Sequence, residues 1–427
     1  MPTTPRHGAH DARRRKDEGA SVWACTPTRT SGPASAPALQ SALPKRPQRG
    51  GARRALLYLV RTVLALAVVG GMAFGTYVLY LESHYTRIAD NTLLEINQAN
   101  ATDVQPQLVA GQTYTATTYN IGFGAYTPDY TFFMDRGAMA DGTATQGTSS
   151  VATGEQSVRD CTAGDIATMR AAAGGMAPDF MLFQEVDVDS DRSYHVDQRT
   201  ALADAFPTYQ SVFASNFHAG FLAWPPTSPH GRVSSGLLTL ADVDVTSALR
   251  RSYPVDESFP TKFFDLDRCF EVLRVPVSDG RELVLINSHL SAYDEGGTVR
   301  ARQLSMLGAV LSAERAAGNY VIAGGDWNHA LCGSLELYPS QQQVPDWVAT
   351  LDDEDLPEGF SVVRAGNLEE VASCRGDDIP YERDVTYTVT VDGFVVSDNV
   401  SATATNIDTG FATSDHNPVL LSFALGA

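Results

Sequence analysis

The pattern of hydrophobic and polar positions divides the chain into a polar start, one long apolar stretch and a region of short apolar runs. Residues 1–54 lack a sustained apolar period and are rich in Pro, Ala, Ser, Thr and Arg. Such a composition cannot bury enough surface to order itself, so we predict a disordered basic arm. The next stretch, 55–81, predicts one helix. We expect a short stalk at 82–110 and a single globular domain over 111–427.

The apolar stretch is long enough to cross a membrane. Val63–Leu81 contains nineteen residues without a charge, and at about 1.5 Å per residue they span roughly 28 Å. Lys and Arg residues precede it and Glu82 follows it, which predicts a single-pass protein of the cell membrane with a cytoplasmic N-terminus and an extracellular domain. A cleaved signal peptide is the alternative. The apolar run continues past a weak cleavage signal at Gly70–Ala73, which favours an uncleaved anchor.

Short apolar runs rich in β-forming residues dominate the rest of the chain, with two helical patterns between them. Many strands with few helices predict an α/β fold, a two-sheet α/β sandwich flanked by helices. We expect a flexible loop at 137–157 and an insertion at 333–360. The predicted strands are Tyr114–Ile121, Phe180–Val186, Gln210–Ala214, Gly236–Leu240, Cys269–Val277, Leu283–Leu290, Tyr320–Ala323, Tyr387–Val396 and Val419–Phe423, and the predicted helices are Ser157–Ala173 and Arg300–Ala317.

Charge is distributed unevenly along the chain, whose formal net charge is −19. Residues 1–61 hold 12 Lys and Arg against 3 Asp and Glu, whereas residues 82–427 hold 19 against 47. An acidic domain with scattered cations repels polyanions. This charge mildly disfavours long nucleic acids as ligands, and phosphate chemistry in the domain would need added cations.

The five cysteines form no CxxC pair, which argues against a zinc finger or a thioredoxin-like site. Four of them lie beyond residue 82 and could pair in an oxidising compartment. A Cys332–Cys374 bridge is an alternative that we disfavour.

Polar residues stand at the ends of predicted strands in six separate segments. A polar group at such a position costs about 1–3 kcal/mol unless it is paired. Strand ends at one edge of a sandwich are where a site would assemble, so we predict a site from these residues. The segments are Asn120, Gln184-Glu185, Asn287-Ser288-His289, Gly325-Asp326-Trp327-Asn328, Asp392 and Ser414-Asp415-His416.

The side chains of these segments suit phosphoester hydrolysis. Carboxylates and amides are hard oxygen ligands, which favour Mg²⁺, Mn²⁺ or Ca²⁺ over soft metals. His289 and His416 can move protons near neutral pH, and an adjacent Asp can orient a His. The oxygen donors are Glu185, Asp326, Asp392, Asp415, Asn120 and Asn328.

The same segments, in the same order, resemble those of the endonuclease/exonuclease/phosphatase superfamily across about residues 113–424. Asn120 resembles the first-strand Asn and Glu185 the metal-binding Glu of a Gln-Glu pair. Asn287–Leu290 resembles the N-[ST]-H-L motif, Gly325–Asn328 the G-D-x-N motif and Ser414–His416 the C-terminal S-D-H. The chain is identified as similar to a membrane-anchored, bacterial-type member, closer to the deoxyribonuclease and sphingomyelinase branches.

The resemblance implies roles for the strand-end residues in the attack of water on a phosphoester. Glu185, with Asn120 and Asp415, would hold the metal. His416, paired with Asp392, would act as base or phosphate clamp, and His289 would bind the phosphate or protonate the leaving oxygen. Asp326 and Asn328 would orient water and stabilise the developing charge. Substrate contacts are predicted for Asn216, His218 and Arg268, although for Arg268 an ion pair with Asp265 or Asp267 is the favoured alternative.

Three functions stay open from the sequence: an extracellular nuclease, a lipid phosphodiesterase and a catalytically silent binding module. The intact motifs argue against the silent module. The charge of the domain and the stretches Phe123–Phe133 and Phe221–Pro226 slightly favour a small or lipid-linked phosphoester over DNA or RNA. The aromatic residues of the first stretch form either local core or a cleft wall. No protein partner is evident.

Overall fold

Two seven-stranded sheets face each other in the computed structural model, which describes residues 50–98, 104–292 and 297–426. One sheet has the order β1-β9-β10-β11-β12-β18-β15 and the other β19-β20-β3-β6-β8-β7-β2. The first contains β1 (Thr92–Leu93), β9 (Ser247–Ser252), β10 (Cys269–Pro276), β11 (Glu282–His289), β12 (Tyr320–Asp326), β18 (Asp392–Ser397) and β15 (Phe360–Val362). The second contains β19 (Val400–Asn406), β20 (Val419–Leu425), β3 (Thr113–Asn120), β6 (Phe180–Asp187), β8 (Gly231–Ala241), β7 (Gln210–Leu222) and β2 (Ile96–Asn97).

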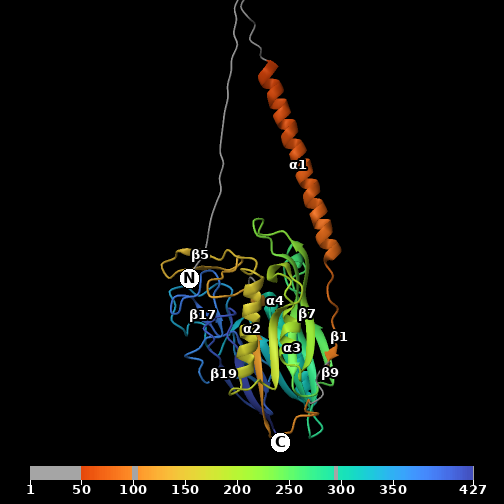
Figure 1. Ribbon diagram of the computed structural model, residues 1–427, viewed down its shortest axis with the longest axis vertical. Coiled ribbons are helices and arrows are strands. Elements are labelled where there is room, and N and C mark those ends of the chain that lie inside the picture. Colours follow the sequence, from red (N-terminus) through yellow and green to blue (C-terminus); the bar gives the residue numbers. More distant parts are fainter. Residues whose placement is uncertain (1–49, 99–103, 293–296, 427) are drawn as a thin grey trace, which may run out of the picture. The chain divides into compact units, whose positions relative to one another are not determined.

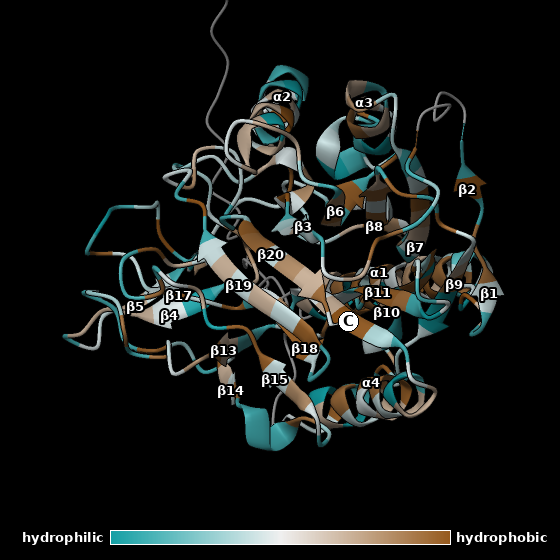
Figure 2. Cartoon of the chain, turned by 90° about the horizontal axis from the view of Figure 1, so that it is seen from below, coloured by the Kyte–Doolittle hydropathy of each residue, from teal (hydrophilic) through white to brown (hydrophobic). Residues whose placement is uncertain are grey.

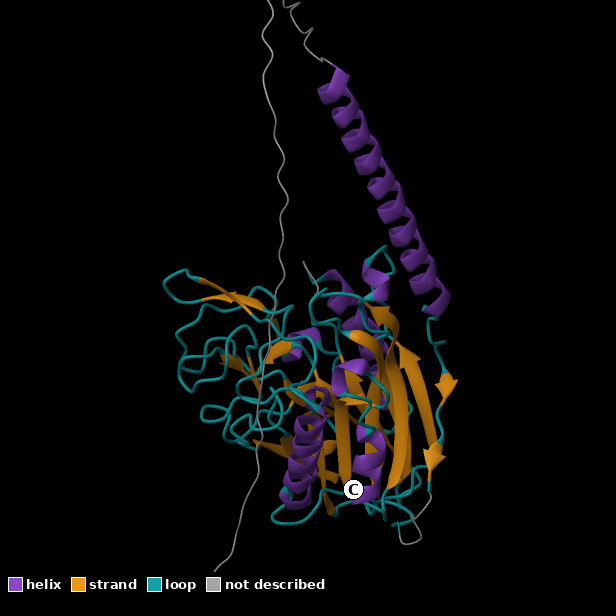
Figure 3. Cartoon of the chain, turned by 45° about the horizontal axis from the view of Figure 1, so that its top comes forward, coloured by secondary structure: helices purple, strands orange, loops and turns teal. Residues whose placement is uncertain are grey.

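Helices cover the outer faces of both sheets, so the predicted two-sheet α/β sandwich is confirmed. Figure 2 shows α2 (Glu155–Ala171) and α3 (Gln198–Ala205) on one side of the strands and α4 (Thr298–Ala316) on the other. The strands run side by side between them in Figure 3. Short pairs complete the fold: β4 (Arg136–Ala138) with β5 (Ala144–Gln146), β13 (His329–Leu331) with β14 (Ala349–Leu351), and β16 (Cys374–Arg375) with β17 (Thr388–Val389).

The main core lies between the two sheets, where strands from both contribute fully buried apolar side chains. Phe180 and Leu421 from one sheet belong to the same buried cluster as Leu285 and Phe394 from the other. On the outer face of the first sheet, Leu307 and Leu311 of α4 are buried against the strands. Both predicted helices are therefore present, each starting two residues earlier than predicted.

Several boundaries differ from the prediction because polar residues interrupt the apolar pattern. β7 continues eight residues past Ala214, with two register shifts in its pairing with β8. Such shifts are β-bulges, which let a strand continue where the alternation of apolar and polar residues is interrupted. The strands β9 and β19 were not predicted, nor was the short helix α3. The predicted strand Tyr387–Val396 is split between β17 and β18. The predicted loop 137–157 contains the β4–β5 turn, and the insertion 333–360 contains β14.

The long apolar helix, α1, runs from Gly50 to His84 and is drawn at the start of the described chain in Figure 1. It begins five residues before the predicted start, and residues 1–49 of the predicted arm lie outside the described residues. By length and composition it could cross a membrane, and a signal sequence would pass the same test. The chain separates into two units, Met1–Val68 and Val69–Ala427. The last turns of α1 therefore belong to the unit that contains the sandwich.

Candidate active site

The registers of the two sheets bring the predicted strand-end residues to one edge. His289 on β11 lies opposite Asp326 on β12, and Asp326 lies opposite Asp392 on β18. In the second sheet, Asn120 on β3 lies opposite Gln184 on β6. β3 and β6 are parallel, as are β11 and β12, so their carboxyl ends meet at the same edge. Side chains from far-apart segments thus gather in one place.

Glu185 occupies an irregular position on β6. The register with β8 shifts between Phe183 and Val186. Glu185 has a backbone φ of 55°, a value that residues other than glycine rarely adopt. Strained backbone of this kind clusters at functional sites. Its neighbour Gln184 is buried and donates to Asn287 of the facing sheet at 2.8 Å. The Gln-Glu pair therefore has two tasks, because Gln184 ties the sheets together while Glu185 lines the pocket.

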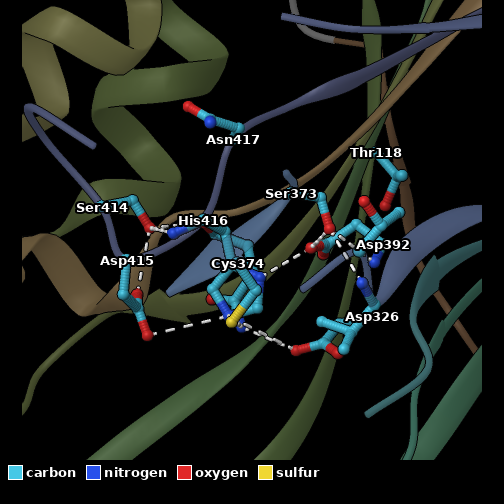
Figure 4. A network of polar contacts seen from close by, with 12 residues as sticks. Thr118, Asp326, Ser373, Cys374, Asp392, Ser414, Asp415, His416 and Asn417 are labelled. Atoms are coloured by element: carbon cyan, nitrogen blue, oxygen red, sulfur yellow. Dashed lines mark hydrogen bonds and ion pairs between the residues drawn. The ribbon is translucent and has the colours of Figure 1, made fainter. Parts of the chain in front are cut away.

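His416 and Asp392 form a buried dyad at the centre of the site, shown in Figure 4. The Nδ1 of His416 donates to Oδ2 of Asp392 at 2.7 Å, and the Ser373 hydroxyl donates to the same oxygen at 2.7 Å. Burial alone lowers the pKa of His416, but the neighbouring carboxylates, Asp392 above all, raise it well above its ordinary value. The ring is therefore held in one orientation and protonated while no cation neutralises these carboxylates.

Asp326 is the hydrogen-bond acceptor beside this dyad. Its Oδ1 accepts from the backbone N–H of Asn328 at 2.9 Å and its Oδ2 from the Asn120 amide at 3.0 Å. Oδ2 also lies 3.3 Å from Nε2 of His289 and 3.7 Å from Nε2 of His416. Asp326 thus connects both predicted catalytic histidines. The Asn328 side chain itself donates to the carbonyl of Leu290 at 2.9 Å.

His289 and Arg268 present unpaired nitrogens inside the protein. Nδ1 of His289 and both Nε and Nη1 of Arg268 are buried without a hydrogen-bond partner, and both residues line the pocket. Burial, then the charges of Arg268 and His416, lowers the pKa of His289 well below its ordinary value. Among the described residues, Arg268 makes no ion pair, so the favoured pairing with Asp265 or Asp267 is wrong. Unpaired buried donors beside a cleft fit an anionic ligand.

Glu185 and Asp415 fit a divalent cation. Desolvation raises the pKa of Glu185; Arg192 opposes this effect and Asp415 adds to it. Two carboxylates that repel each other in a pocket are hard oxygen donors, and the Asn120 amide nitrogen donates to the Glu185 carboxylate at 3.4 Å. A second grouping, Asp326, Asp392 and His416, also brings one possible ligand atom each within 4.8 Å of the others. The hydrogen bonds of the dyad already use part of that second set.

The site opens into a pocket of about 480 Å³. For the aromatic stretch Phe123–Phe133 we expected either local core or a cleft wall. It forms both, since Phe123 and Tyr126 belong to a local core cluster and also line the pocket. Polar groups line one region: Asn120, Glu185, His289, Asp326, Asn328, Asp377, Asp415 and His416. Apolar groups also line the pocket, among them Phe132, Phe133, Met134, Phe217, Leu222, Trp224, Phe264 and Leu266.

Sequence reasoning missed two buried arginines of the pocket. Arg192 forms an ion pair with Asp187 at 2.8 Å and lies over the Phe123 ring at 3.9 Å. Asp187 is fully buried although it opens the acidic run Asp187–Asp191. Arg375 forms a close ion pair with Asp377. Their only sequence signal was an acidic residue two to five positions away, which is common on surfaces.

Some predicted residues are placed apart from the site. His218 is exposed on β7 and does not line the pocket, so its predicted substrate contact is not supported. Asn216 is buried with both side-chain polar atoms unpartnered, yet it does not line the pocket either. The four cysteines in the described part of the chain are free, so the Cys332–Cys374 alternative is wrong. Cys374 instead lies with its sulfur 3.7 Å from Nε2 of His416.

Comparison with known proteins yields structural likeness only. No family model and no curated protein matches the chain. Truncated TDP2 from Caenorhabditis elegans is 15% identical with a TM-score of 0.44, covering 74% of this chain and 99% of that one. An endonuclease/exonuclease/phosphatase from Beutenbergia cavernae DSM 12333 is 15% identical with a TM-score of 0.47, covering 74% and 72%. ANGEL2, described as a 2′,3′-cyclic phosphatase, is 14% identical with a TM-score of 0.46, covering 78% and 99%.

Proposed function

We propose that this chain is a membrane-anchored, divalent-metal-dependent phosphoesterase whose catalytic domain lies outside the cell. It hydrolyses a phosphodiester or phosphomonoester by in-line attack of water. The observation that carries the proposal is the buried Asp392–His416 dyad, which faces Asp326 and a carboxylate pair in one pocket. A positioned His with a buried Asp partner is an arrangement for proton transfer.

The dyad supports the proton transfer that starts hydrolysis. Asp392 fixes the ring through Nδ1, which leaves Nε2 of His416 directed toward Asp326 and Asp415, each 3.7 Å away. The ring accepts the proton of the attacking water once the negative charge around it is neutralised. Until then its raised pKa favours the imidazolium, which clamps a phosphate oxygen. Asp326 orients the water or the phosphate from the side opposite Asp392.

Arg268 and His289 supply the anion-binding side of the reaction. The unpaired nitrogens of Arg268 donate to phosphate oxygens without giving up another partner. Burial and the neighbouring cations lower the pKa of His289 and so favour its neutral form, whereas an anion beside the ring favours the protonated form. The protonated ring then donates to the phosphate or to the leaving oxygen.

The carboxylates Glu185 and Asp415, with Asn120, would hold the cation. A bound divalent cation supplies positive charge to the phosphate oxygens and lowers the pKa of water. The oxygen-only donor set supports Mg²⁺, with Mn²⁺ or Ca²⁺ as alternatives.

The cations of the pocket favour a small or lipid-linked substrate over DNA or RNA. Of the three arginines that line it, Arg192 and Arg375 are ion-paired with aspartates. This leaves Arg268 for one phosphate group, whereas each phosphate of a nucleic acid normally draws on its own Lys or Arg. The largely apolar wall of the pocket fits a hydrophobic group next to that phosphate.

The apolar run that continues past the weak cleavage signal at Gly70–Ala73 supports an anchor over a cleaved signal peptide. The end of the same helix is fixed to the domain, because Leu81 is buried among side chains of β7 and β8, and Glu82 forms an ion pair with Lys262 at 2.8 Å. The excess of Lys and Arg before the helix supports a cytoplasmic N-terminus. Protease added to intact cells should therefore release the catalytic domain, and full protection of the domain would contradict this topology.

An activity panel tests the proposal. The detergent-solubilised full chain is assayed on bis(p-nitrophenyl) phosphate, on a phospholipid in micelles and on plasmid DNA. Activity should stop with EDTA and return with Mg²⁺ or Mn²⁺. Cleavage of plasmid DNA at least tenfold more efficient than that of the other substrates would identify a tethered nuclease instead. If none of the three substrates were hydrolysed in a metal-dependent reaction, the proposal would be contradicted.

A further inference from the structure

The last turns of α1 are built into the tip of the β7–β8 hairpin. The hydroxyl of Tyr77 donates to the carbonyl of Phe221 at 3.0 Å and accepts from the N–H of Ala223 at 2.9 Å. The hydroxyl of Tyr80 accepts from the N–H of Phe221 at 3.0 Å. Gly220 lets the helix approach, because a Cβ there would come within 3.0 Å of the His84 side chain. The hairpin edge is thus hydrogen-bonded to the helix.

These tyrosines lie in the apolar stretch that we propose to span the bilayer. One face of the helix end, including Tyr77, Tyr80 and Leu81, packs on the hairpin, while Phe74 and Leu79 remain 64% and 71% exposed. Tyr and Trp are enriched where a membrane meets water, since their rings are apolar and their tips are polar. The hairpin tip that binds Tyr77 must therefore lie at that level if α1 crosses the membrane.

Exposed aromatic side chains surround this contact. They come from the end of β7, from the loop after it and from the loop between β9 and β10; β7 and the β9–β10 loop also contribute to the buried cluster around Leu81. Exposed apolar groups gathered in one area mark an interaction site on a soluble protein. The four, named here the aromatic rim, are Phe221 (40% exposed), Trp224 (61%), Phe259 (56%) and Phe264 (39%).

The aromatic rim leads into the candidate active site. Trp224 and Phe264 line the pocket that also holds Glu185 and His416. Leu222 contributes both to the cluster around Leu81 and to the pocket wall. The residues that bind the end of α1 therefore adjoin the wall of the pocket that holds the catalytic groups.

We propose that the aromatic rim inserts into the outer face of the membrane that α1 spans, and that the pocket takes a phosphoester carried by a membrane lipid. This rests on the proposed phosphoesterase function. The occupant of the rim is the lipid surface, because the rim is continuous with residues of the anchor itself. The phosphate reaches Arg268 while the hydrocarbon part stays against Trp224, Phe264 and Leu266. A water-soluble substrate without a hydrocarbon part would not be stabilised by contact with this apolar wall.

Fluorescence quenching in nanodiscs tests the insertion directly. The chain has 4 Trp residues, so the full-length protein and its Trp224→Phe variant are compared in nanodiscs with lipids brominated just below the headgroups. The emission assigned to Trp224 by difference should fall by at least half relative to unbrominated lipids. A Trp224 emission, obtained by the same difference, that is equal in brominated and unbrominated lipids would place Trp224 in water and overturn the proposal.

Rates on two substrates test the function of the rim. The variant Phe221→Ser/Phe259→Ser changes rim residues that do not line the pocket, and Met176→Ser removes a side chain of 70% exposure elsewhere as a matched control. The double variant should hydrolyse a phospholipid in vesicles at least tenfold more slowly and bis(p-nitrophenyl) phosphate at an unchanged rate. Equal rates of all proteins on vesicles would overturn the proposal. If the wild type did not hydrolyse bis(p-nitrophenyl) phosphate, that result would instead count against the phosphoesterase function. The quenching result would still decide whether the rim inserts into the membrane.

Discussion

The two acidic regions of the pocket are built differently. Around His416, hydrogen bonds hold each carboxylate in place, since Oδ2 of Asp392 accepts from Ser373 and His416 and Asp326 accepts from two asparagines. In the other region, burial and the charge of Asp415 raise the pKa of the Glu185 and Asp377 carboxyls. Burial raises the pKa of Asp377 well above its ordinary value; Arg375 opposes this effect and Asp415 adds to it.

This difference shows which region the protein holds in place without a ligand. The dyad region is organised by the protein alone, because donors fixed by packing hold both aspartates. The Glu185–Asp415 region keeps like charges together at a cost, and such a cost is relieved when a cation binds. The comparison predicts that substitutions in the first region change catalysis without changing the response to metal, and that substitutions in the second change that response.

The largest expected effect is that of the dyad histidine on turnover. His416→Ala should lower kcat by about 10²–10⁴-fold, the usual contribution of a general acid or base. His289→Ala should cause a loss of the same order. Hydrolysis of bis(p-nitrophenyl) phosphate at saturating Mg²⁺ measures both.

His218→Ala is the matched control, because this exposed histidine does not line the pocket. It should keep wild-type kcat and KM. Wild-type activity in both His416→Ala and His289→Ala would show that these histidines do not carry the reaction.

The next effect concerns stability in the presence of metal. A ligand at one hundred times its Kd stabilises a protein by about 2.7 kcal/mol, so Mg²⁺ should raise the Tm of the wild type. Glu185→Gln should raise the Tm in EDTA, since it removes a repelling charge, and should abolish most of the shift with Mg²⁺. Asp392→Asn should lower the Tm in EDTA and keep that shift. A full Mg²⁺ shift in Glu185→Gln would move the cation site to the second grouping of residues.

The carboxyl group of Glu271 shows the effect of burial on a pKa apart from the effects of a cation or a histidine. Glu271 lies between the sheets, and burial raises its pKa to about 8 although Thr239 and Asn287 donate to it. Its folded pKa exceeds the unfolded value of 4.5. Its contribution to stability is therefore complete below pH 4.5 and is lost as the pH rises through 8.

Glu271→Gln should remove this pH dependence, which amounts to about 2 kcal/mol between pH 5 and pH 7. Urea unfolding of both proteins at the two pH values gives the difference. An unchanged slope in the variant would mean that Glu271 stays ionised in the folded protein.

Site residues at the ends of long predicted strands or next to them could be predicted from the sequence, whereas those of the segment between β15 and β18 could not. Asp326 and Asp392 end or begin apolar runs, and sheet register then places them together. Ser373, Arg375 and Asp377 come from the irregular segment between β15 and β18, where no periodicity marks which side chains turn inward. The fold followed from the strand count and the two helical patterns.

The errors have a common physical cause. Sequence pattern reports local alternation, whereas burial of a polar residue depends on a partner supplied by the fold. Asp187 is buried because Arg192 neutralises it, and β7 continues past Ala214 because β8 pairs with it through bulges. Neither partner is visible from composition. The roles of the site residues stay predictions, which the substitutions above address.

The smallest expected effect comes from a glycine next to the proposed cation site. Gly122 has a φ of +51°, and a Cβ there would come within 2.8 Å of Oδ1 of Asp415 and 2.5 Å of the Tyr126 ring. Gly122→Ala should therefore displace the Asp415 carboxylate without changing any charge. We expect the Mg²⁺ concentration for half-maximal activity to rise about tenfold, as when a residue that orients a metal ligand is altered. Mg²⁺ titration of the hydrolysis rate measures this.

Gly174→Ala is the control for backbone strain alone. Gly174 has a φ of +63° with nothing within 4 Å of an added Cβ, so the variant shares the cost of an unfavourable conformation but touches no carboxylate. It should lose a similar amount of stability and keep the wild-type Mg²⁺ dependence. Because the two variants differ chiefly in the contact with Asp415 and Tyr126, equal Mg²⁺ dependence in both would mean that Asp415 does not hold the cation. The dyad region would then have to supply the metal ligands as well.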